Sequence, residues 1–344
     1  MKRPTTTTPA VLLIAIFLVS LNVQRLIVFD DHIEHPLSVY SYGGTVSQKP
    51  VCLAPQLSPS EQQGTWMGNW WVPPSGWEIF GPEDLRHIFH NTSMLWLGDS
   101  TARRTSTTLY HIIENHNVTE ALGRKEMNPK SRLNINKGVI VEPCLKWDNS
   151  SLHYPYYCRT MPNRPENDFI HMFKPCFHEI APFLRDEIAG LSNVTDNINV
   201  LVVSMGVWHV VHPKECLDFD NTTEWLDQVL ESLYDFQRAR PHVKVIWRTS
   251  NYDPKHSAPK TELINEYSME QIDKYQSELS ASETARVTYI DWGTAVRSRT
   301  VGKDRVPADI NPHTGLEPRL VMIQMIANLL RSDQEAAEDC VDSH

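Results

Sequence analysis

The seven-residue run NVLVVSM, from Asn199 to Met205, is the feature that most constrains the fold of this chain. A short, continuous apolar run of this kind is typical of a strand that is buried on both faces of a parallel sheet. Further short apolar strands are predicted at Met94–Leu97, Val243–Trp247 and Val287–Ile290. Segments with helical spacing separate these strands. The alternation predicts an α/β fold, namely a three-layer α/β/α arrangement around a doubly wound, mostly parallel sheet.

The intervening helices are predicted from apolar residues that recur every three or four positions. They are Thr101–Asn115, Glu224–Arg240, Thr261–Ser280 and Pro318–Leu330. Residues 125–183 show no clear period, and we expect an irregular insertion there that is braced by disulfides.

The N-terminal thirty residues differ from the rest of the chain. Lys2 and Arg3 precede an apolar run, Ala10–Leu21, and the run resumes at 26–29 after an interruption that includes Arg25. Because a membrane-spanning helix needs about 20 apolar residues, we interpret this segment as a signal anchor with its basic end in the cytoplasm. A cleaved signal peptide is the alternative. Either interpretation sends the remaining chain into the secretory lumen.

These features predict a chain organised around one large domain. The predicted parts are a cytoplasmic tail at 1–9, the anchor at 10–29, a stalk at 30–60, a catalytic domain at 61–331 and an acidic tail at 332–344.

Cysteine usage and glycosylation sequons support the secretory compartment. The six cysteines are an even set without C-x-x-C spacing, which favours disulfides over zinc, and no metal site is predicted. N-x-S/T sequons occur at Asn91, Asn117, Asn149, Asn193 and Asn221. We expect a single-pass type II protein of the Golgi or another secretory-pathway membrane with its catalytic domain in the lumen, or alternatively a secreted protein.

The charge of the chain argues against a nucleic-acid partner. Its formal net charge is -10, and no cluster of Lys and Arg is visible that could replace the counterions of phosphate groups.

Polar residues follow each predicted strand. In an open parallel sheet, ligands bind beyond the carboxyl ends of the strands, so these residues are expected to meet at one rim. They are Gly98-Asp99-Ser100, Gly206-Val207-Trp208-His209, Arg248-Thr249-Ser250 and Asp291-Trp292-Gly293, with a further polar loop, Asp309 to His313, before the last helix.

Ser100 is the candidate nucleophile at this rim. A serine hydroxyl needs an imidazole to take its proton and a third group to orient that imidazole, and His313 and Asp309 can serve in these roles. Backbone N–H groups of Ser100, at a helix start, and of Gly206, which has no Cβ, can form an oxyanion hole. The alternative for Ser100 is an N-cap.

The order of four sequence blocks resembles a known superfamily. LWLGDSTARR, SMGVWH, WRTSNYDPKH and DINPH, followed by an apolar helix, resemble the SGNH hydrolases, most closely the PC-esterase branch that includes trichome birefringence-like polysaccharide O-acetyltransferases. The resemblance implies that Ser100, Asp309 and His313 form the triad and that Gly206 donates to the oxyanion. It also implies a glycan substrate, an acetyl donor as co-substrate and no bound cofactor.

The sequence departs from the family pattern at two places. Three residues separate Asp309 from His313 where the family usually has two, so Asp304 is an alternative acid. The hydrolase-type Asn after the oxyanion glycine is absent, and His209 or Arg248 is a candidate for the missing donor.

Five further side chains at the rim are candidates for substrate binding. They are Asp99, Arg103, Trp208, His209 and Arg248. Two of them also have a structural alternative: His209 can be a buried support, and Arg248 can pair with a carboxylate beneath the site. The tryptophans around Trp66 can stack on sugar rings or pack on the core as a lid.

The sequence therefore predicts a luminal serine O-acetyltransferase that acts on glycan hydroxyls through an acyl-serine. A carbohydrate acetylesterase with the same triad is the alternative, because either a sugar hydroxyl or water can resolve the acyl-enzyme. Two other classes of protein are alternatives. Asp218-Phe219-Asp220 is a D-x-D that can hold a metal in a glycosyltransferase, and the altered spacing before His313 can indicate an inactive glycan-binding module.

Overall fold

The structure is a computed structural model that describes residues 57–114, 157–161, 164–188, 197–217, 221–251, 258–279, 285–300 and 314–342. All described residues belong to one compact unit, residues 51–344. The predicted cytoplasmic tail, the anchor and most of the stalk lie outside the described residues. Within the described ranges, no helix combines the length and apolar character needed to cross a bilayer.

A six-stranded sheet forms the centre of the described unit, in the order β4-β5-β3-β6-β7-β8. Four strand pairs are parallel and the edge pair, β4 with β5, is antiparallel, which confirms the predicted mostly parallel α/β sheet. A separate antiparallel hairpin is formed by β1 and β2. The strands are β1 (Thr65–Met67), β2 (Trp70–Val72), β3 (Met94–Gly98), β4 (Tyr157–Met161), β5 (Arg164–Phe173), β6 (Val200–Ser204), β7 (Lys244–Arg248) and β8 (Val287–Ile290).

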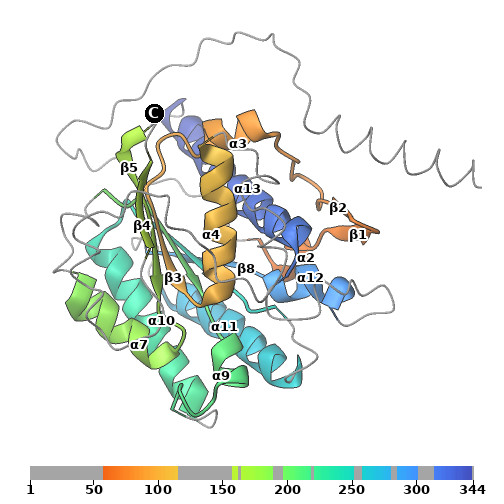
Figure 1. The fold of residues 1–344 in the computed structure, drawn as a ribbon. Helices are drawn as coiled ribbons and strands as arrows, with labels where there is room; N and C mark the ends of the chain where they lie inside the picture. The colour runs from red at the N-terminus through yellow and green to blue at the C-terminus, as the bar shows by residue number, and fades with distance from the viewer. Residues whose placement is uncertain are drawn as a thin grey trace, which may run out of the picture. The chain divides into compact units, whose positions relative to one another are not determined.

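Helices cover both faces of this sheet (Figure 1). The helices are α2 (Pro59–Gln62), α3 (Pro82–Ile88), α4 (Ser100–Ile113), α7 (Phe177–Pro182), α9 (Val207–Val211), α10 (Thr222–Ala239), α11 (Ala258–Glu278), α12 (Trp292–Thr300) and α13 (Leu316–Asp342), with a π-helical turn at Phe183–Glu187.

Side chains that alternate along each strand build two separate apolar cores. On β3, Leu95 and Leu97 belong to the core that includes residues of α7, α10 and α11. Met94 and Trp96 point the other way, into the core that includes residues of α3, α4, α12 and α13. Because both faces are buried, every residue of β3 and of β6 is buried, as a continuous apolar run requires.

The predicted strands match β3, β6, β7 and β8 to within one residue at each end. The prediction for residues 125–183 was incomplete, because β4, β5 and α7 lie in its described part. Polar residues begin β5, and only its last five residues form an apolar stretch, which His171 interrupts, so the strand gives a weak sequence signal. The last helix also extends beyond the predicted Leu330, to Asp342.

Candidate active site

The candidate site lies at the point where the strand order of the sheet reverses. From β3 the chain passes to β5 on one side and later to β6 on the other, so β3 and β6 form the switch point at which open α/β sheets bind ligands. The two strands end in register, with Gly98 opposite Ser204. Ser100 and Gly206 each follow these paired residues by two positions. Two predicted site residues therefore lie at adjacent strand ends.

Gly98 allows the ends of β3 and β6 to approach closely. Its φ is +152°, and a Cβ at this position would lie 1.9 Å from the carbonyl oxygen of Ser204. Only glycine fits this contact, since the obstruction is backbone. The residue thereby fixes the turn that delivers Asp99 and Ser100 from the strand into α4.

Asp99, and not Ser100, caps α4. The Asp99 Oδ1 accepts hydrogen bonds from the Thr101 backbone N–H and from Thr101 Oγ1, both at 2.7 Å. Ser100 is the first residue of the helix and is half-buried. The N-cap alternative for Ser100 was therefore wrong, and Ser100 stands at the positive end of the helix macrodipole.

A buried polar network lies under the first turn of α4. Arg248, at the end of β7, donates to Thr101 Oγ1 at 3.1 Å and to Ser204 Oγ, and its guanidinium lies over the Trp292 ring at 5.2 Å from the centroid. Arg248 and Asp99 interact electrostatically. Arg248 thus supports the first turn of α4 from beneath, and its charge favours the ionised form of Asp99.

Burial sets the charges of this network. Burial lowers the pKa of Arg248 to about 10, and the Asp99 charge opposes that shift, so the guanidinium is charged at neutral pH. Burial likewise raises the pKa of Asp99, against the hydrogen bonds from Thr101 and the charge of Arg248. Asp99 is 0% and Arg248 2% exposed, so both side chains support α4 from below. Such burial does not support the expectation that they contact substrate.

Gly206 occupies a turn in which any side chain is strained. Its φ is +119°, and a Cβ would lie 2.5 Å from Ser250 Oγ. The Ser250 hydroxyl donates to the Met205 carbonyl, and its backbone is held by Asn265 of α11 through hydrogen bonds of 2.8 and 2.7 Å. Gly206 precedes α9, so its backbone N–H belongs to a turn that is fixed on one side by β7 and α11.

His209 and Trp208 lie in α9, directly after this turn. His209 is 0% exposed, and its Nε2 accepts a hydrogen bond from the Phe177 N–H at 2.8 Å. Trp208 is half-buried and packs edge-to-face on Phe173 at 5.5 Å between ring centroids and against His212 at 4.3 Å. The structural alternative for His209 is therefore the arrangement found, whereas Trp208 remains a candidate for substrate contact.

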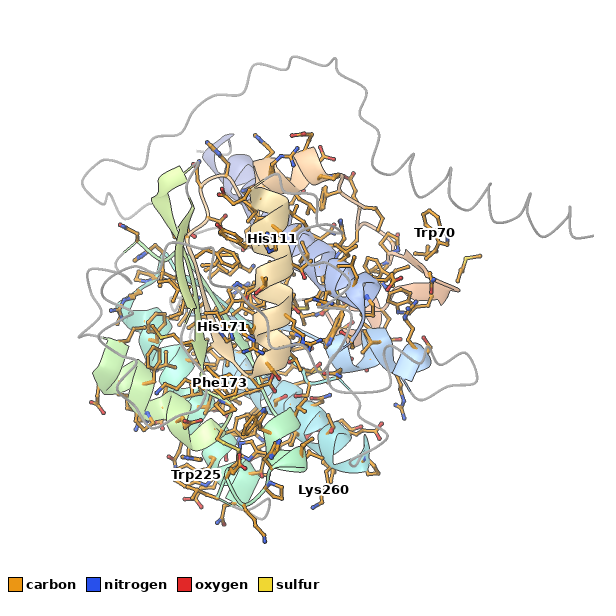
Figure 2. The ribbon with its side chains drawn as sticks, in the orientation of Figure 1. Trp70, His111, His171, Phe173, Trp225 and Lys260 are labelled. Atoms are coloured by element: carbon orange, nitrogen blue, oxygen red, sulfur yellow. A yellow bond between two sulfur atoms is a disulfide. The ribbon has the colours of Figure 1, made fainter. Side chains whose placement is uncertain are left out.

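Arg103 lies one turn after Ser100 on α4. It is half-buried, and its positive charge disfavours the protonated form of His171 of β5. Figure 2 shows His171 and Phe173 along β5, whose carboxyl end lies next to the start of α4. Burial, reinforced by Arg103, lowers the pKa of His171 to about 3, so its ring is neutral. His171 could not be placed at this site from the sequence because β5 was not predicted.

The tryptophan-rich segment packs mainly on the core. Trp71 and Trp77 are buried, and Trp66 is partly buried against α12, where its Nε1 donates to the Ala295 carbonyl at 2.7 Å. Trp70 is 54% exposed on the β1–β2 hairpin and points away from the sheet in Figure 2.

Several predicted residues fall outside the described residues. They are Asp304, Asp309 and His313, the D-x-D acids Asp218 and Asp220, and the sequon residues Asn117, Asn149 and Asn193. The other two sequon residues, Asn91 and Asn221, are exposed. Description resumes at Thr314, which is buried and directly follows His313.

The helix that follows Thr314 packs against α4. Arg319, near the start of α13, donates to Thr108 Oγ1 of α4 at 3.4 Å. Farther along α13, Gln324 bonds the Phe80 backbone and Asn328 bonds the Glu78 backbone, just before α3. Figure 1 shows α13 beside α4.

No protein-family model matches this chain, and no curated protein matches it. The solved structures that resemble it distantly include the following three. A carbohydrate esterase family 3 structure from Talaromyces cellulolyticus is 18% identical, with 51% of this chain and 78% of that one covered, at a TM-score of 0.35. A catalytic mutant of an acetylxylan esterase from Geobacillus stearothermophilus is 9% identical, with coverage of 70% and 94% and a TM-score of 0.38. An acetyl esterase mutant with an acetate ion is 19% identical, with coverage of 53% and 79% and a TM-score of 0.33.

Proposed function

We propose that this protein is a serine O-acetyltransferase of glycans that works through an acyl-Ser100 intermediate. The observation that carries the proposal is the placement of Ser100 and Gly206 at adjacent, in-register strand ends of the switch point. A hydroxyl at a helix start and two backbone N–H groups nearby are the elements that acyl transfer requires. The order of the four sequence blocks, which resembles the SGNH hydrolases and their PC-esterase branch, supports the same chemistry and a glycan acceptor.

In the proposed mechanism, His313 takes the proton of Ser100 while the serine oxygen attacks the acyl carbonyl. The developing oxyanion accepts hydrogen bonds from the N–H groups of Ser100 and Gly206, and Asp309 orients the imidazole. The proton then passes from His313 to the leaving group of the donor. A sugar hydroxyl next gives its proton to His313 and attacks the acyl-enzyme, which forms the new ester, and His313 returns the proton to the departing Ser100 oxygen.

The packing of α13 on α4 supports a role for His313. The Arg319–Thr108 contact lies eight residues along α4 from Ser100, roughly 12 Å at 1.5 Å per residue. His313 precedes Leu316, the first residue of α13, by three residues, which span up to about 10 Å when extended, and Leu316 lies roughly 4.5 Å along the helix from Arg319. The chain before α13 is therefore long enough to bring the imidazole to the serine.

The test of the nucleophile is labelling with a serine-reactive phosphonate. We expect the wild-type luminal part to be labelled at Ser100 and the Ser100→Ala variant to lose the label. Ser106→Ala is the matched control, because Ser106 lies on the same helix but is buried and donates to the Arg103 carbonyl. Labelling that survives in Ser100→Ala would remove Ser100 from the mechanism.

An esterase with the same residues differs only in the acceptor, and isotope labelling separates the two activities. A glycan is incubated with protein and an acetyl donor in water enriched in ¹⁸O, and the products are weighed by mass spectrometry. Transfer predicts acetylated glycan and little labelled acetate. Labelled acetate without acetylated glycan would replace the transferase by a carbohydrate acetylesterase.

We also propose that residues 10–29 anchor the chain in a secretory-pathway membrane with the catalytic domain in the lumen. The apolar segment behind two basic residues and the even set of cysteines support this. Protease treatment of microsomes is expected to spare the domain until detergent is added. Digestion in intact microsomes would place the domain in the cytoplasm.

A further inference from the structure

Two loops that leave the sheet on either side of β3 are covalently joined. The loop after β5 leads to Cys176 at the start of α7, and the loop after β6 passes through Gly206 and α9 to Cys216. Cys176 and Cys216 form a disulfide with their Cα atoms 5.2 Å apart. Because β3 lies between β5 and β6 in the sheet, this bond joins the segments that flank the strand end carrying Ser100.

His209 makes a second link between the same two loops. Its Nε2 accepts a hydrogen bond from the Phe177 N–H at 2.8 Å, and the two rings stack with centroids 4.2 Å apart. Phe177 is the first residue of α7, and the first N–H groups of a helix have no partner within the helix. The acceptor for the buried Phe177 N–H, in the segment after β5, is therefore His209, in the segment after β6. His209 belongs to α9, which begins directly after Gly206.

The ring of His209 can perform this role at neutral pH. Burial, followed in size by the effect of His178, lowers the pKa of His209 to about 3. The ring is therefore neutral, and because Nε2 accepts a hydrogen bond, the proton lies on Nδ1. A protonated ring would have no acceptor for the Phe177 N–H.

The Gly206 turn is thus held from two directions. Ser250 holds the Met205 carbonyl from the side of β7 and α11, whereas His209 and the disulfide hold α9 from the side of α7. We infer that His209 is a positioning residue that, together with the Cys176–Cys216 bond, fixes the Gly206 N–H in the orientation that receives the oxyanion. This inference rests on the proposed function of the same site.

The test compares two substitutions of similar size. His209→Phe keeps the stacking on Phe177 but removes the acceptor, whereas His209→Gln places Oε1 near the position of Nε2. We expect His209→Phe to lower kcat for a small acetyl ester about 10- to 100-fold, because a misplaced donor is costly, with KM nearly unchanged. His209→Gln is expected to recover most of that loss.

Hydrogen exchange gives a readout that does not depend on turnover. Backbone amides in residues 205–211 are expected to exchange faster in His209→Phe than in the wild type, and His209→Gln is expected to restore their protection. Wild-type kcat in His209→Phe, equal losses in both variants, or unchanged exchange in 205–211 would each overturn the inference. If His209→Phe does not fold, the Cys176→Ala/Cys216→Ala double variant decides in the same way, through lower kcat and faster exchange.

The failure of the proposed function is distinguishable from the failure of this inference. A wild-type protein that neither turns over an acetyl ester nor reacts with the phosphonate at Ser100 would refute the proposed function. Hydrogen exchange would then decide alone whether His209 holds the Gly206 turn.

Discussion

At the scale of single residues, Gly206 carries the sharpest expectation. Replacing it with alanine places a Cβ 2.5 Å from Ser250 Oγ at a φ of +119°. We expect Gly206→Ala to cost about 1–3 kcal/mol of unfolding free energy and to lower kcat about 100-fold, because the oxyanion N–H is displaced. Urea unfolding and ester turnover measure the two effects.

Gly76→Ala is the control for backbone strain at Gly206. Gly76 also has a positive φ, +84°, but a Cβ there would meet nothing within 4 Å. We expect a comparable loss of stability with full activity. Full activity in Gly206→Ala would show that this turn does not serve the reaction.

The Asp99–Arg248 network predicts a stability difference that depends on pH. Arg248→Met leaves the buried Asp99 carboxylate without its cation, which is expected to cost about 3 kcal/mol at neutral pH. The pKa of Asp99 is already raised by burial, so the folded state holds its proton more tightly and the stability that Asp99 contributes falls as pH rises above the unfolded pKa near 3.9. Loss of Arg248 raises that pKa further.

The deficit of Arg248→Met should therefore grow as pH rises and shrink as pH falls from about 7 toward about 4, because protonation removes the Asp99 charge that Arg248 balances. Urea unfolding of the variant and the wild type at both pH values measures it. Arg238→Met is the control, because Arg238 pairs with Asp235 at the surface and is expected to change stability by less than about 0.5 kcal/mol. A deficit that does not vary with pH would contradict the coupling to Asp99.

The sequence could identify residues whose position follows from strand ends, and not those defined by distant partners. Gly98, Ser100 and Gly206 are recognisable because small and polar residues interrupt apolar runs at the carboxyl edge. Asn265 gave no signal, since an asparagine within a helix looks like any exposed polar residue until Ser250 is placed against it. The acceptor role of His209 likewise depends on α7, which the sequence did not predict.

At the scale of elements, the buried cation Arg299 and the Trp66–Ala295 hydrogen bond hold the β1–β2 hairpin against α12. The Arg299 guanidinium lies 4.2 Å from the Trp66 ring centroid and donates to the Gly68 carbonyl and to Asn69 Oδ1. Arg299→Gln is expected to cost about 2 kcal/mol, because it removes charged hydrogen bonds and a cation–π contact together. Urea unfolding, monitored by tryptophan fluorescence, measures the loss of unfolding free energy.

Arg297→Gln is the matched control on the same helix. The Arg297 side chain is 53% exposed and pairs with Glu262, so its loss is expected to cost less than about 0.5 kcal/mol. Equal effects of the two substitutions would mean that Arg299 does not fasten the hairpin.

Predictability also differed between elements for a physical reason. Strands at the centre of the sheet are apolar throughout because helices cover both of their faces, and their runs are visible in the sequence. β5 pairs with an antiparallel edge strand over part of its length and begins with polar residues, so no continuous run marks it. Short helices such as α9 and α12 follow directly after the polar residues at the strand ends. Their sequences show no apolar periodicity from which a helix could be predicted.

At the scale of the whole molecule, the proposed function requires Ser100, in the first third of the chain, to meet His313, near its end. The sheet order and the contact of α13 with α4 bring the flanking elements together. We therefore expect a short bis-maleimide linker to join the two introduced cysteines in a Ser100→Cys/His313→Cys double variant. Mass spectrometry detects the joined peptides.

The control pair is Ser100→Cys with Arg331→Cys. Arg331 is exposed and lies 15 residues beyond Leu316, roughly 22 Å along α13 in the direction away from Ser100. This pair is expected to remain unlinked under the same conditions. Absence of the Ser100–His313 product, or equal linking of both pairs, would show that the fold does not bring the hydroxyl and the imidazole together, and the acyl-serine mechanism would lose its base.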